Sequence, residues 1–213
     1  MYLKDIMTTN VVTIPSSTSI ADAKRIMKAH KFRRLPVVDK GKLVGLVTEN
    51  RLESVSPSKA TSLSVWEIGY LLEKTTVKEI MEKHLTTAVP DMTVEEAISI
   101  SQQNKVGALI VLEDNRVVGI VTTNDLFYKI VNKVLGIGEK GTRIEVTDGG
   151  EGKALEEVIS CANKHGLRIV TIHIISLPEK TKHDLVIHVD GTETSKLIDE
   201  LIGKGYTVTI RKR

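Results

Sequence analysis

Apolar and polar positions follow the same order twice along the first two thirds of the chain. Each copy begins with a short extended segment and a proline, followed by apolar residues at the three- and four-residue spacing of an amphipathic helix. Two apolar runs joined by a tight turn then predict a strand pair, and a second helix follows Thr48 or Thr122, which suit an N-cap. The expected extended segments are residues 11–14 and 85–89, and the expected strand pairs are 35–38 with 43–47 and 109–112 with 117–121.

The same repetition is visible letter by letter. GKLVGLVTENRL at residues 41–52 recurs as NRVVGIVTTNDL at residues 115–126, and KDIM at residues 4–7 recurs as KEIM at residues 78–81. The offset is 74 positions at both ends of the unit, because 119 − 45 and 81 − 7 are equal. A constant offset over the whole unit indicates one duplicated structural module of β-α-β-β-α order.

The last third of the chain has a different pattern. It predicts a β-α-β-β-α-β order, which is the ferredoxin-like plan. The expected elements are a strand at 143–147, a helix at 152–165, strands at 167–176 and 184–189, a helix at 194–204 and a strand at 206–210.

Residues 136–141, GIGEKG, match the letters of the dinucleotide fingerprint G-x-G-x-x-G. That motif must follow a strand and open a helix. Here a predicted helix precedes it and a predicted strand follows, so we interpret it as a flexible linker with a glycine helix stop.

Composition narrows the class of protein. A net charge of +3 over 213 residues is too small to indicate nucleic acid or a membrane surface. The single cysteine, Cys161, excludes an internal disulfide and fits a reducing compartment, and its apolar helical setting predicts a small buried side chain. The N-terminus lacks the apolar core of a signal peptide, and no run approaches the roughly 18 apolar residues of a membrane span. We therefore expect a cytoplasmic protein with neither nucleic acid nor membrane as a partner.

The repeated β-α-β-β-α order and the G-h-h-T-x-x-D ending of the second unit, GIVTTND, resemble the CBS domain family. CBS repeats occur in tandem and pack through their sheets into one module. A β-α-β-β-α-β domain behind such repeats resembles an ACT domain. Between the repeats, a turn-like SPSKATSLS stretch at residues 56–64 precedes a helix-like VWEIGYLLEK at residues 65–74. With these features the chain resembles the AcuB-like CBS–ACT proteins, named after an acetoin-utilisation operon.

This resemblance implies an α+β fold class, with tandem CBS repeats forming one module and a ferredoxin-like ACT-type domain behind it. The expected domains are residues 1–54 (first CBS repeat), 55–76 (inter-repeat linker with a helix), 77–135 (second CBS repeat), 136–142 (Gly-rich linker) and 143–213 (ACT-like domain).

The resemblance also implies an adenine nucleotide as ligand. In CBS proteins the last aspartate of G-h-h-T-x-x-D accepts both ribose hydroxyls, which assigns that role to Asp125, one helical turn after Thr122. The family's base slot uses backbone that corresponds here to Thr87, Ala88, Val106, Gly107 and Ala108. We therefore expect the second repeat to supply the principal nucleotide site.

The first repeat departs from the family pattern. Asp125 corresponds to Arg51 (51 + 74 = 125), and an arginine has only donors, so it cannot accept ribose hydroxyls. The same donors suit phosphate, so Arg51 is a candidate phosphate-binding residue. Arg33 and Arg34 occupy the place where relatives carry phosphate-binding arginines, and a guanidinium fork suits phosphate oxygens. The alternative for this pair is a solvated rim. Thr48, like its counterpart in the second repeat, suits helix capping and ligand contact equally.

Two further kinds of site are weakly indicated. In ACT domains the first β-α turn holds an amino acid, so Asp148, Gly150 and Gly152 are candidate residues, although an extra residue before Gly152 breaks the family pattern. The histidines of the last third lack an accompanying cysteine or carboxylate cluster, so we expect surface or satisfied histidines and no metal site.

These inferences predict a non-catalytic energy sensor that binds AMP, or else ADP, ATP or another adenosyl compound, with no obligatory cofactor. A ligand-free interaction module that regulates a partner enzyme is the alternative. An enzyme ranks last, because neither a nucleophile–base pair nor a P-loop is present. We also expect a homodimer, formed through two apolar helical faces. These faces comprise Val65, Ile68, Leu71 and Leu72, and Leu197, Ile198, Leu201 and Ile202.

Overall fold

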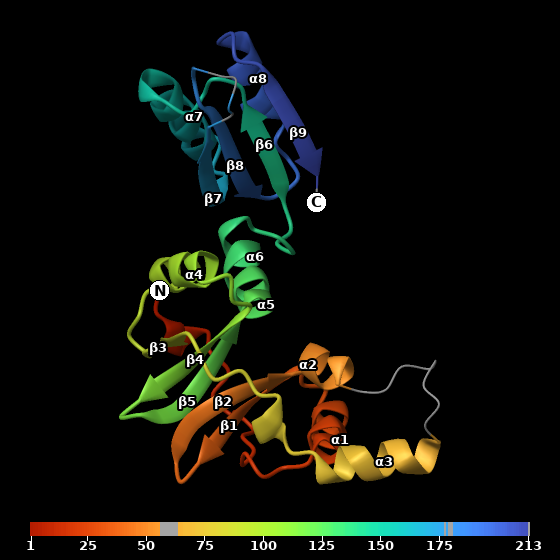
Figure 1. Cartoon of the computed structure of the whole chain (residues 1–213). Coiled ribbons are helices and arrows are strands. Elements are labelled where there is room, and N and C mark those ends of the chain that lie inside the picture. The colour runs from red at the N-terminus through yellow and green to blue at the C-terminus, as the bar shows by residue number, and fades with distance from the viewer. Residues whose placement is uncertain (56–63, 177, 179–180, 213) are drawn as a thin grey trace. The chain divides into compact units, whose positions relative to one another are not determined.

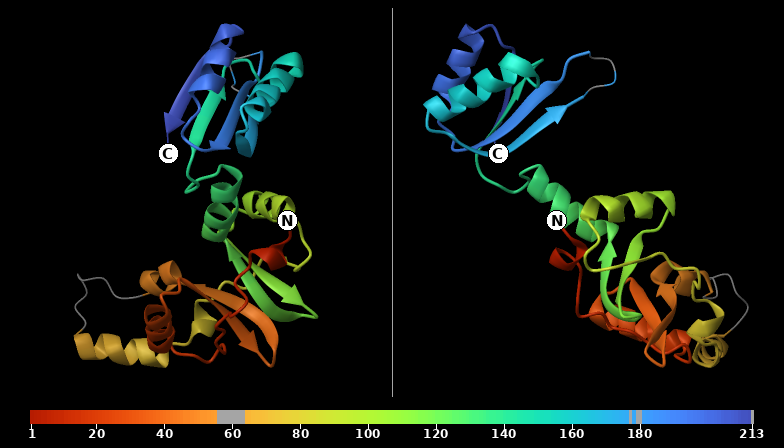
Figure 2. Two further views of the ribbon diagram at one scale, coloured as in Figure 1. Left: turned by 180° about the vertical axis from the view of Figure 1, so that it is seen from behind. Right: turned by 90° about the vertical axis from the view of Figure 1, so that its left-hand side faces the viewer.

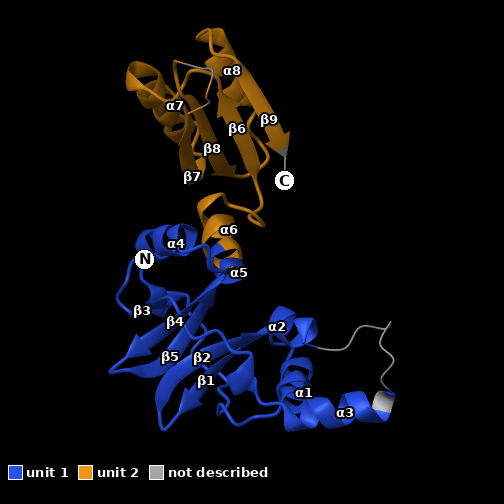
Figure 3. Ribbon diagram, in the orientation of Figure 1, with its two compact units in different colours: residues 1–126 blue, residues 127–213 orange. Residues whose placement is uncertain are grey.

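The computed structural model describes residues 1–55, 64–176, 178 and 181–212 (Figure 1). The chain divides into two compact units, residues 1–126 and 127–213 (Figure 3). The turn-like segment expected at residues 56–64 lies, except for Ser64, outside the described residues. Among the described residues no helix is both long and apolar enough to cross a lipid bilayer.

The first repeat forms the elements that its periodicity predicts. They are α1 (Ile20–His30), β1 (Arg34–Asp39), β2 (Lys42–Thr48), α2 (Glu49–Ser54) and, before the second repeat, α3 (Val65–Lys74). Strands β1 and β2 are antiparallel, and the turn between them places Lys40 and Gly41 at φ of 50° and 79°. Glycine tolerates such a left-handed position without a Cβ clash, which explains its place in this turn.

The second repeat follows the same plan. Its elements are β3 (Thr87–Ala88), α4 (Val94–Gln103), β4 (Ala108–Glu113), β5 (Arg116–Thr122), and a helical run of α5 (Thr123–Asp125), η3 (Leu126–Val131) and α6 (Asn132–Val134). In the first strand pair Arg34 is the cross-strand partner of Thr48, and in the second strand pair the equivalent residues Ala108 and Thr122 are partners. Both predicted strand pairs are therefore confirmed in register. Of the extended segment expected at residues 11–14, Ile14 makes a parallel bridge to Val37.

The short segments that begin the two repeats are exchanged between them. The first contains η1 (Leu3–Asp5), and the amide of Leu3 donates to Met92 O at 2.9 Å in the second repeat. The other contains η2 (Val77–Glu79), and the amide of Val77 donates to Thr18 O at 2.8 Å in the first repeat. Val77 is fully buried in the core of the first repeat. Each repeat is thus completed by the opening segment of the other.

Two glycines make room for this exchange. The Met7 side chain lies over Gly119 of β5, and a Cβ at Gly119 would approach Met7 Cγ to 3.0 Å. In the equivalent place, a Cβ at Gly45 of β2 would lie 2.8 Å from Met81 Cγ. The constant offset between the two methionines and the two glycines therefore reflects one contact made twice.

The second unit has the expected β-α-β-β-α-β order. Its elements are β6 (Thr142–Val146), α7 (Gly152–Lys164), β7 (Arg168–Ile175), β8 (Asp184–Asp190), α8 (Ser195–Gly203) and β9 (Val208–Lys212), with strand order β7-β8-β6-β9. Both helices cover one face of the sheet (Figure 2). The core between these layers includes Ile144 of β6, Val158 of α7 and Ile187 of β8, together with the fully buried Leu197 and Leu201 of α8.

Helices α7 and α8 are also joined by a polar contact. Lys164 Nζ donates to both carboxylate oxygens of Glu200 at 3.0 and 2.9 Å, and His165 Nε2 lies 2.8 Å from Glu200 Oε2. The buried Cys161 thiol donates to Glu200 Oε1 at 3.4 Å, which confirms the expected buried cysteine. Hydrogen bonds from Lys164 first, then from His165 and Cys161, lower the pKa of Glu200 to about 2.

The glycine-containing segment at residues 136–141 ends a helix and leads into a strand. Gly136 has a φ of 62°, and the amide of Ile137 donates to Asn132 O at 2.7 Å, which closes the helical run. The fingerprint context of a strand followed by a helix is not met. The carbonyl of Lys140 lies 3.2 Å from Nε2 of His188, a buried side chain of β8.

Candidate functional site

Two clefts of the first unit occupy equivalent places in the two repeats. The Asp125 cleft has a volume of about 280 Å³ and the Thr48 cleft about 160 Å³. The Asp125 cleft is lined by Thr8, Val11, Lys31, Phe32, Arg33, Arg34, Ile120, Thr122, Asn124 and Asp125. The Thr48 cleft is lined by Arg34, Leu46, Thr48, Glu82, His84, Leu85, Thr86, Lys105, Val106, Gly107, Ala108 and Ile110.

The linings of the two clefts correspond through the 74-residue offset. Residues 31–34 of one correspond to 105–108 of the other, and Thr122 corresponds to Thr48. Each cleft combines a helix-starting threonine of one repeat with the segment that leads into the antiparallel strand pair of the other repeat. Each cleft also takes residues from an exchanged segment, so Thr8 corresponds to Glu82. Both repeats are therefore needed to build either cleft.

Asp125 is held in place by a reciprocal cap at the start of α5. Its carboxylate Oδ2 accepts from the amide of Thr122 at 2.9 Å and from Thr122 Oγ1 at 2.7 Å. The Asp125 amide in turn donates to Thr122 Oγ1 at 3.3 Å. This capping box fixes the carboxylate at the cleft wall, where it can accept hydrogen bonds from a ligand.

Positive charge also lines the Asp125 cleft. Lys31, Arg33 and Arg34 all line it. Arg33 Nε lies 3.7 Å from Glu49 Oε2, and its side chain is largely exposed. Arg34 is less exposed, and burial, followed by repulsion from Arg33, lowers the pKa of its guanidinium. The cleft therefore contains a carboxylate acceptor and three cationic side chains.

The structure groups the predicted nucleotide residues differently from the sequence. We expected Val106, Gly107 and Ala108 to share a site with Asp125, but they line the Thr48 cleft. Asp125 instead shares its cleft with Arg33 and Arg34. The reason is that the segment that leads into the antiparallel strand pair of each repeat lines a cleft with the helix start of the other repeat.

The remaining predicted residues lie beside the clefts. Thr87 and Ala88 form β3, next to Thr86 of the Thr48 cleft, and pair with Ile110 and Val111. Arg51 is exposed on α2 and lines neither cleft, so the Thr48 cleft lacks a counterpart of Asp125.

Several lining residues were missed from the sequence alone. They include Thr8, Val11, Glu82, His84 and Lys105. Thr8 comes from the exchanged segment, which pairs with Ile120 of the second repeat although it precedes the first repeat in sequence. The signal that could have found them is the constant offset, since positions 8 and 11 correspond to 82 and 85.

The candidate amino-acid turn of the second unit is closed by its own hydrogen bonds. The amide of Asp148 donates to Asp184 Oδ1 at 3.0 Å, and the amide of Gly150 donates to His183 O at 2.9 Å. Gly152 begins α7 at a φ of 52°. Asp148 and Gly150 are thus brought together, but their amides are engaged within the protein.

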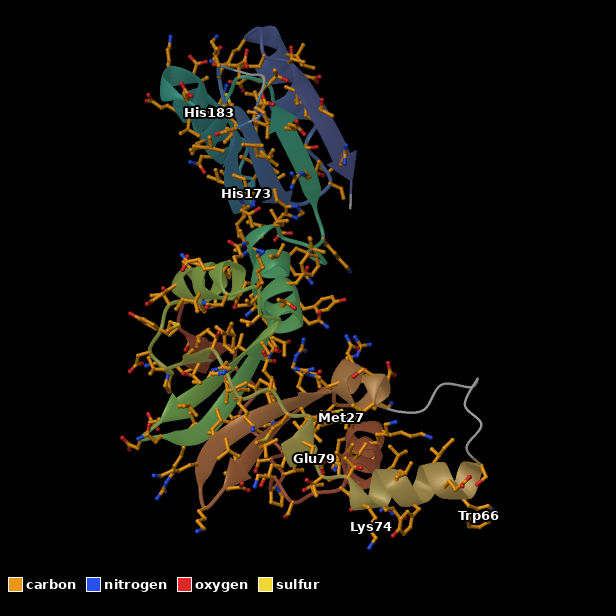
Figure 4. All side chains as sticks on the ribbon, viewed as in Figure 1. Met27, Trp66, Lys74, Glu79, His173 and His183 are labelled. Atoms are coloured by element: carbon orange, nitrogen blue, oxygen red, sulfur yellow. The ribbon has the colours of Figure 1, made fainter. Side chains whose placement is uncertain are left out.

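No group of three or more His, Cys, Asp or Glu side chains is arranged to hold a metal ion within residues 1–55, 64–176, 178 and 181–212. His173 lies on β7 and His183 just before β8 (Figure 4).

Comparison with known proteins assigns the two repeats. The CBS domain family matches residues 3–56 and 77–132. A CBS domain-containing protein, YhcV of Bacillus subtilis, is 30% identical over 124 residues, which cover 58% of this chain and 81% of YhcV. Other relatives are enzymes in which the matched region makes up less than half of the length.

Two solved structures resemble the same part of the chain. The CBS domain pair of protein MJ0100, in complex with 5′-methylthioadenosine and S-adenosyl-L-methionine, has a TM-score of 0.51 and 30% identity, and the match covers 62% of this chain and 98% of that one. A putative acetoin utilization protein (AcuB) from Vibrio cholerae has a TM-score of 0.53 and 28% identity, and the match covers 66% and 98%.

Proposed function

Because the chain belongs to the family of CBS-domain proteins, we propose that it is a non-catalytic regulatory protein that binds an adenine nucleotide, AMP foremost, in the Asp125 cleft. The observation that carries this proposal is that Asp125 lines the same cleft as Lys31, Arg33 and Arg34. A nucleotide needs an acceptor for its ribose hydroxyls and cations for its phosphate, and this cleft offers both.

The CBS pair of MJ0100 supports a ligand that contains an adenosyl group. The two compounds in the complex with the MJ0100 pair both contain adenosine, and neither carries a phosphate. In the present chain the three cations favour a phosphate on that adenosine, because a guanidinium pairs with phosphate oxygens in a two-pronged geometry. We therefore place AMP before 5′-methylthioadenosine and S-adenosyl-L-methionine.

Isothermal titration calorimetry with AMP tests this proposal. Asp125→Ala should weaken binding by about 1.5–3 kcal/mol, the value for a hydrogen bond to a charged group, which is roughly 10- to 150-fold in Kd. Asp125→Asn retains a capping side chain and separates loss of charge from loss of the cap. Arg51→Ala is the matched control, because it changes the equivalent residue outside the cleft and should leave AMP affinity within about twofold.

Thermal-shift measurements with a panel of adenosyl compounds distinguish the nucleotide-binding protein from the alternative, a ligand-free interaction module. If AMP, ADP, ATP and S-adenosyl-L-methionine all leave the melting temperature unchanged, the chain is a ligand-free interaction module. A ligand at a hundredfold excess over its Kd should instead stabilise the folded chain by about 2.7 kcal/mol.

The second unit has a β-α-β-β-α-β order, and we infer that it is an ACT-type domain with a role in dimerisation or amino-acid sensing. Leu197 and Leu201 are buried in its own core, so they are not available to a partner. The exposed apolar side chains include Ile202 in this unit and Tyr70 and Leu71 on α3. Trp66, also on α3, is exposed as well (Figure 4). A homodimer through such surfaces fits the proposed regulatory role.

A further inference from the structure

The Asp125 cleft and the Thr48 cleft share one cationic side chain. Arg34 lines both, and it also lines a hollow of about 300 Å³ whose wall includes Thr48 and Asn124. Its guanidinium reaches the Thr48 cleft over Gly107: a Cβ built on Gly107 would lie 2.8 Å from Arg34 Nη2. The absence of a side chain at Gly107 is what gives the guanidinium this position.

Arg34 has no anionic partner among the described residues. Arg33, beside it, has Glu49 at 3.7 Å, whereas no hydrogen bond or ion pair of the Arg34 side chain occurs within the part of the chain that the structure describes. Its partial burial costs the guanidinium hydration without a carboxylate in return. Such a group is a strong binding partner for a ligand phosphate from either side.

The repeat symmetry provides no second copy of this residue. The position equivalent to Arg34 is Ala108 (34 + 74 = 108), and the position equivalent to Arg33 is Gly107. Lys31 and Lys105 are equivalent, and each lines only its own cleft of the two. Each cleft therefore has a lysine that the other lacks, whereas Arg34 is common to both clefts.

We propose that Arg34 couples the two clefts, because it binds the phosphate of a nucleotide in one cleft at the expense of a nucleotide in the other. The inference rests on the proposed function. A first AMP in the Asp125 cleft engages Arg34, so a second AMP in the Thr48 cleft binds more weakly. By linkage the effect is reciprocal: each AMP lowers the affinity of the other cleft by the same factor.

Isothermal titration calorimetry of AMP binding to the full chain tests the coupling, because removing one cleft should strengthen binding in the other. The wild type should bind two AMP molecules in two steps of unequal affinity. Asp125→Ala disables one cleft and releases Arg34 to the other. The remaining Thr48 cleft should then bind AMP at least about fivefold more tightly than the second step of the wild type, fivefold being the lower end of ordinary coupling. Arg34→Ala combined with Asp125→Ala should abolish that gain.

Lys31→Ala and Lys105→Ala are matched controls, and each should weaken binding in one cleft only. Arg34→Ala should weaken the first step and leave the second within about twofold, because the second AMP already binds without Arg34 in the wild type. Arg34→Gln replaces Arg34→Ala if that variant does not fold. Equal affinity of the Thr48 cleft with and without Asp125, a stoichiometry of one AMP, or equal weakening of both steps by Arg34→Ala would overturn the coupling. A wild type that binds no AMP contradicts the proposed function itself.

Discussion

Adding one methyl group to Gly119 tests whether the exchanged segments hold the two repeats together. A Cβ at this position would lie 3.0 Å from Met7 Cγ and 3.3 Å from Met7 Cβ, closer than the roughly 3.5–4.0 Å of favourable carbon contact. Overpacking of this kind costs about 1–3 kcal/mol. Replacing a strand glycine returns about 0.5–1 kcal/mol of backbone entropy. The cost of overpacking exceeds the gain in backbone entropy, so Gly119→Ala should lower the free energy of unfolding by about 1–2 kcal/mol.

Denaturant unfolding followed by circular dichroism measures this value, and a double-mutant cycle assigns its cause. The nearest atoms to the added methyl all belong to Met7. In a Met7→Ala background Gly119→Ala should therefore cost little, which leaves an interaction energy of about 1 kcal/mol between the two changes. If Gly119→Ala is as stable as the wild type, or costs the same in both backgrounds, the contact between Met7 and β5 does not hold the repeats together.

Three other predictions concern separate parts of the chain. The pKa of Glu200 falls from 4.5 to about 2 on folding, so the stability that its ionised carboxylate contributes is present above pH 4.5 and is lost as pH falls through about 2. The melting temperature should therefore fall between about pH 5 and pH 2, and Glu200→Gln should reduce this pH dependence. Gly69 is exposed within α3 and a Cβ there would meet nothing within 4 Å, so Gly69→Ala should stabilise the chain by up to about 1 kcal/mol in denaturant unfolding. Light scattering of the wild type should give twice the 23.5 kDa chain mass. Trp66→Glu places a charge on a side chain position that is 89% exposed and should reduce the measured mass to that of the monomer. A wild-type monomer at micromolar concentration contradicts the homodimer.

The elements of the fold were predictable because their signals are local. A tight turn between two apolar runs predicted β1 with β2 and β4 with β5, and the 74-residue offset placed Arg34 with Thr48 in the same relation as Ala108 with Thr122. Helical periodicity likewise marked α1 and α4. These patterns depend on neighbours in sequence, so tertiary packing did not change them.

The partner of each segment was not predictable, because a duplicated sequence offers two equivalent partners for every contact. Met7 fits Gly119 as well as its own repeat's Gly45, and local periodicity cannot distinguish them. The same ambiguity placed Asp125 with Val106 rather than with Arg33. Only the three-dimensional exchange decides which repeat completes which cleft.

The exchanged segments bear on how such a chain could arise. A half-length protein with a single repeat would carry an opening segment like the one at η1, which has no place on its own strands, and a vacant strand edge of complementary shape. Two copies would satisfy both needs at once, as protomers do when they swap an element. Duplication and fusion of the coding sequence would then tether an assembly that already existed. After fusion the two halves could diverge independently, and an arginine acquired in one of them would serve both.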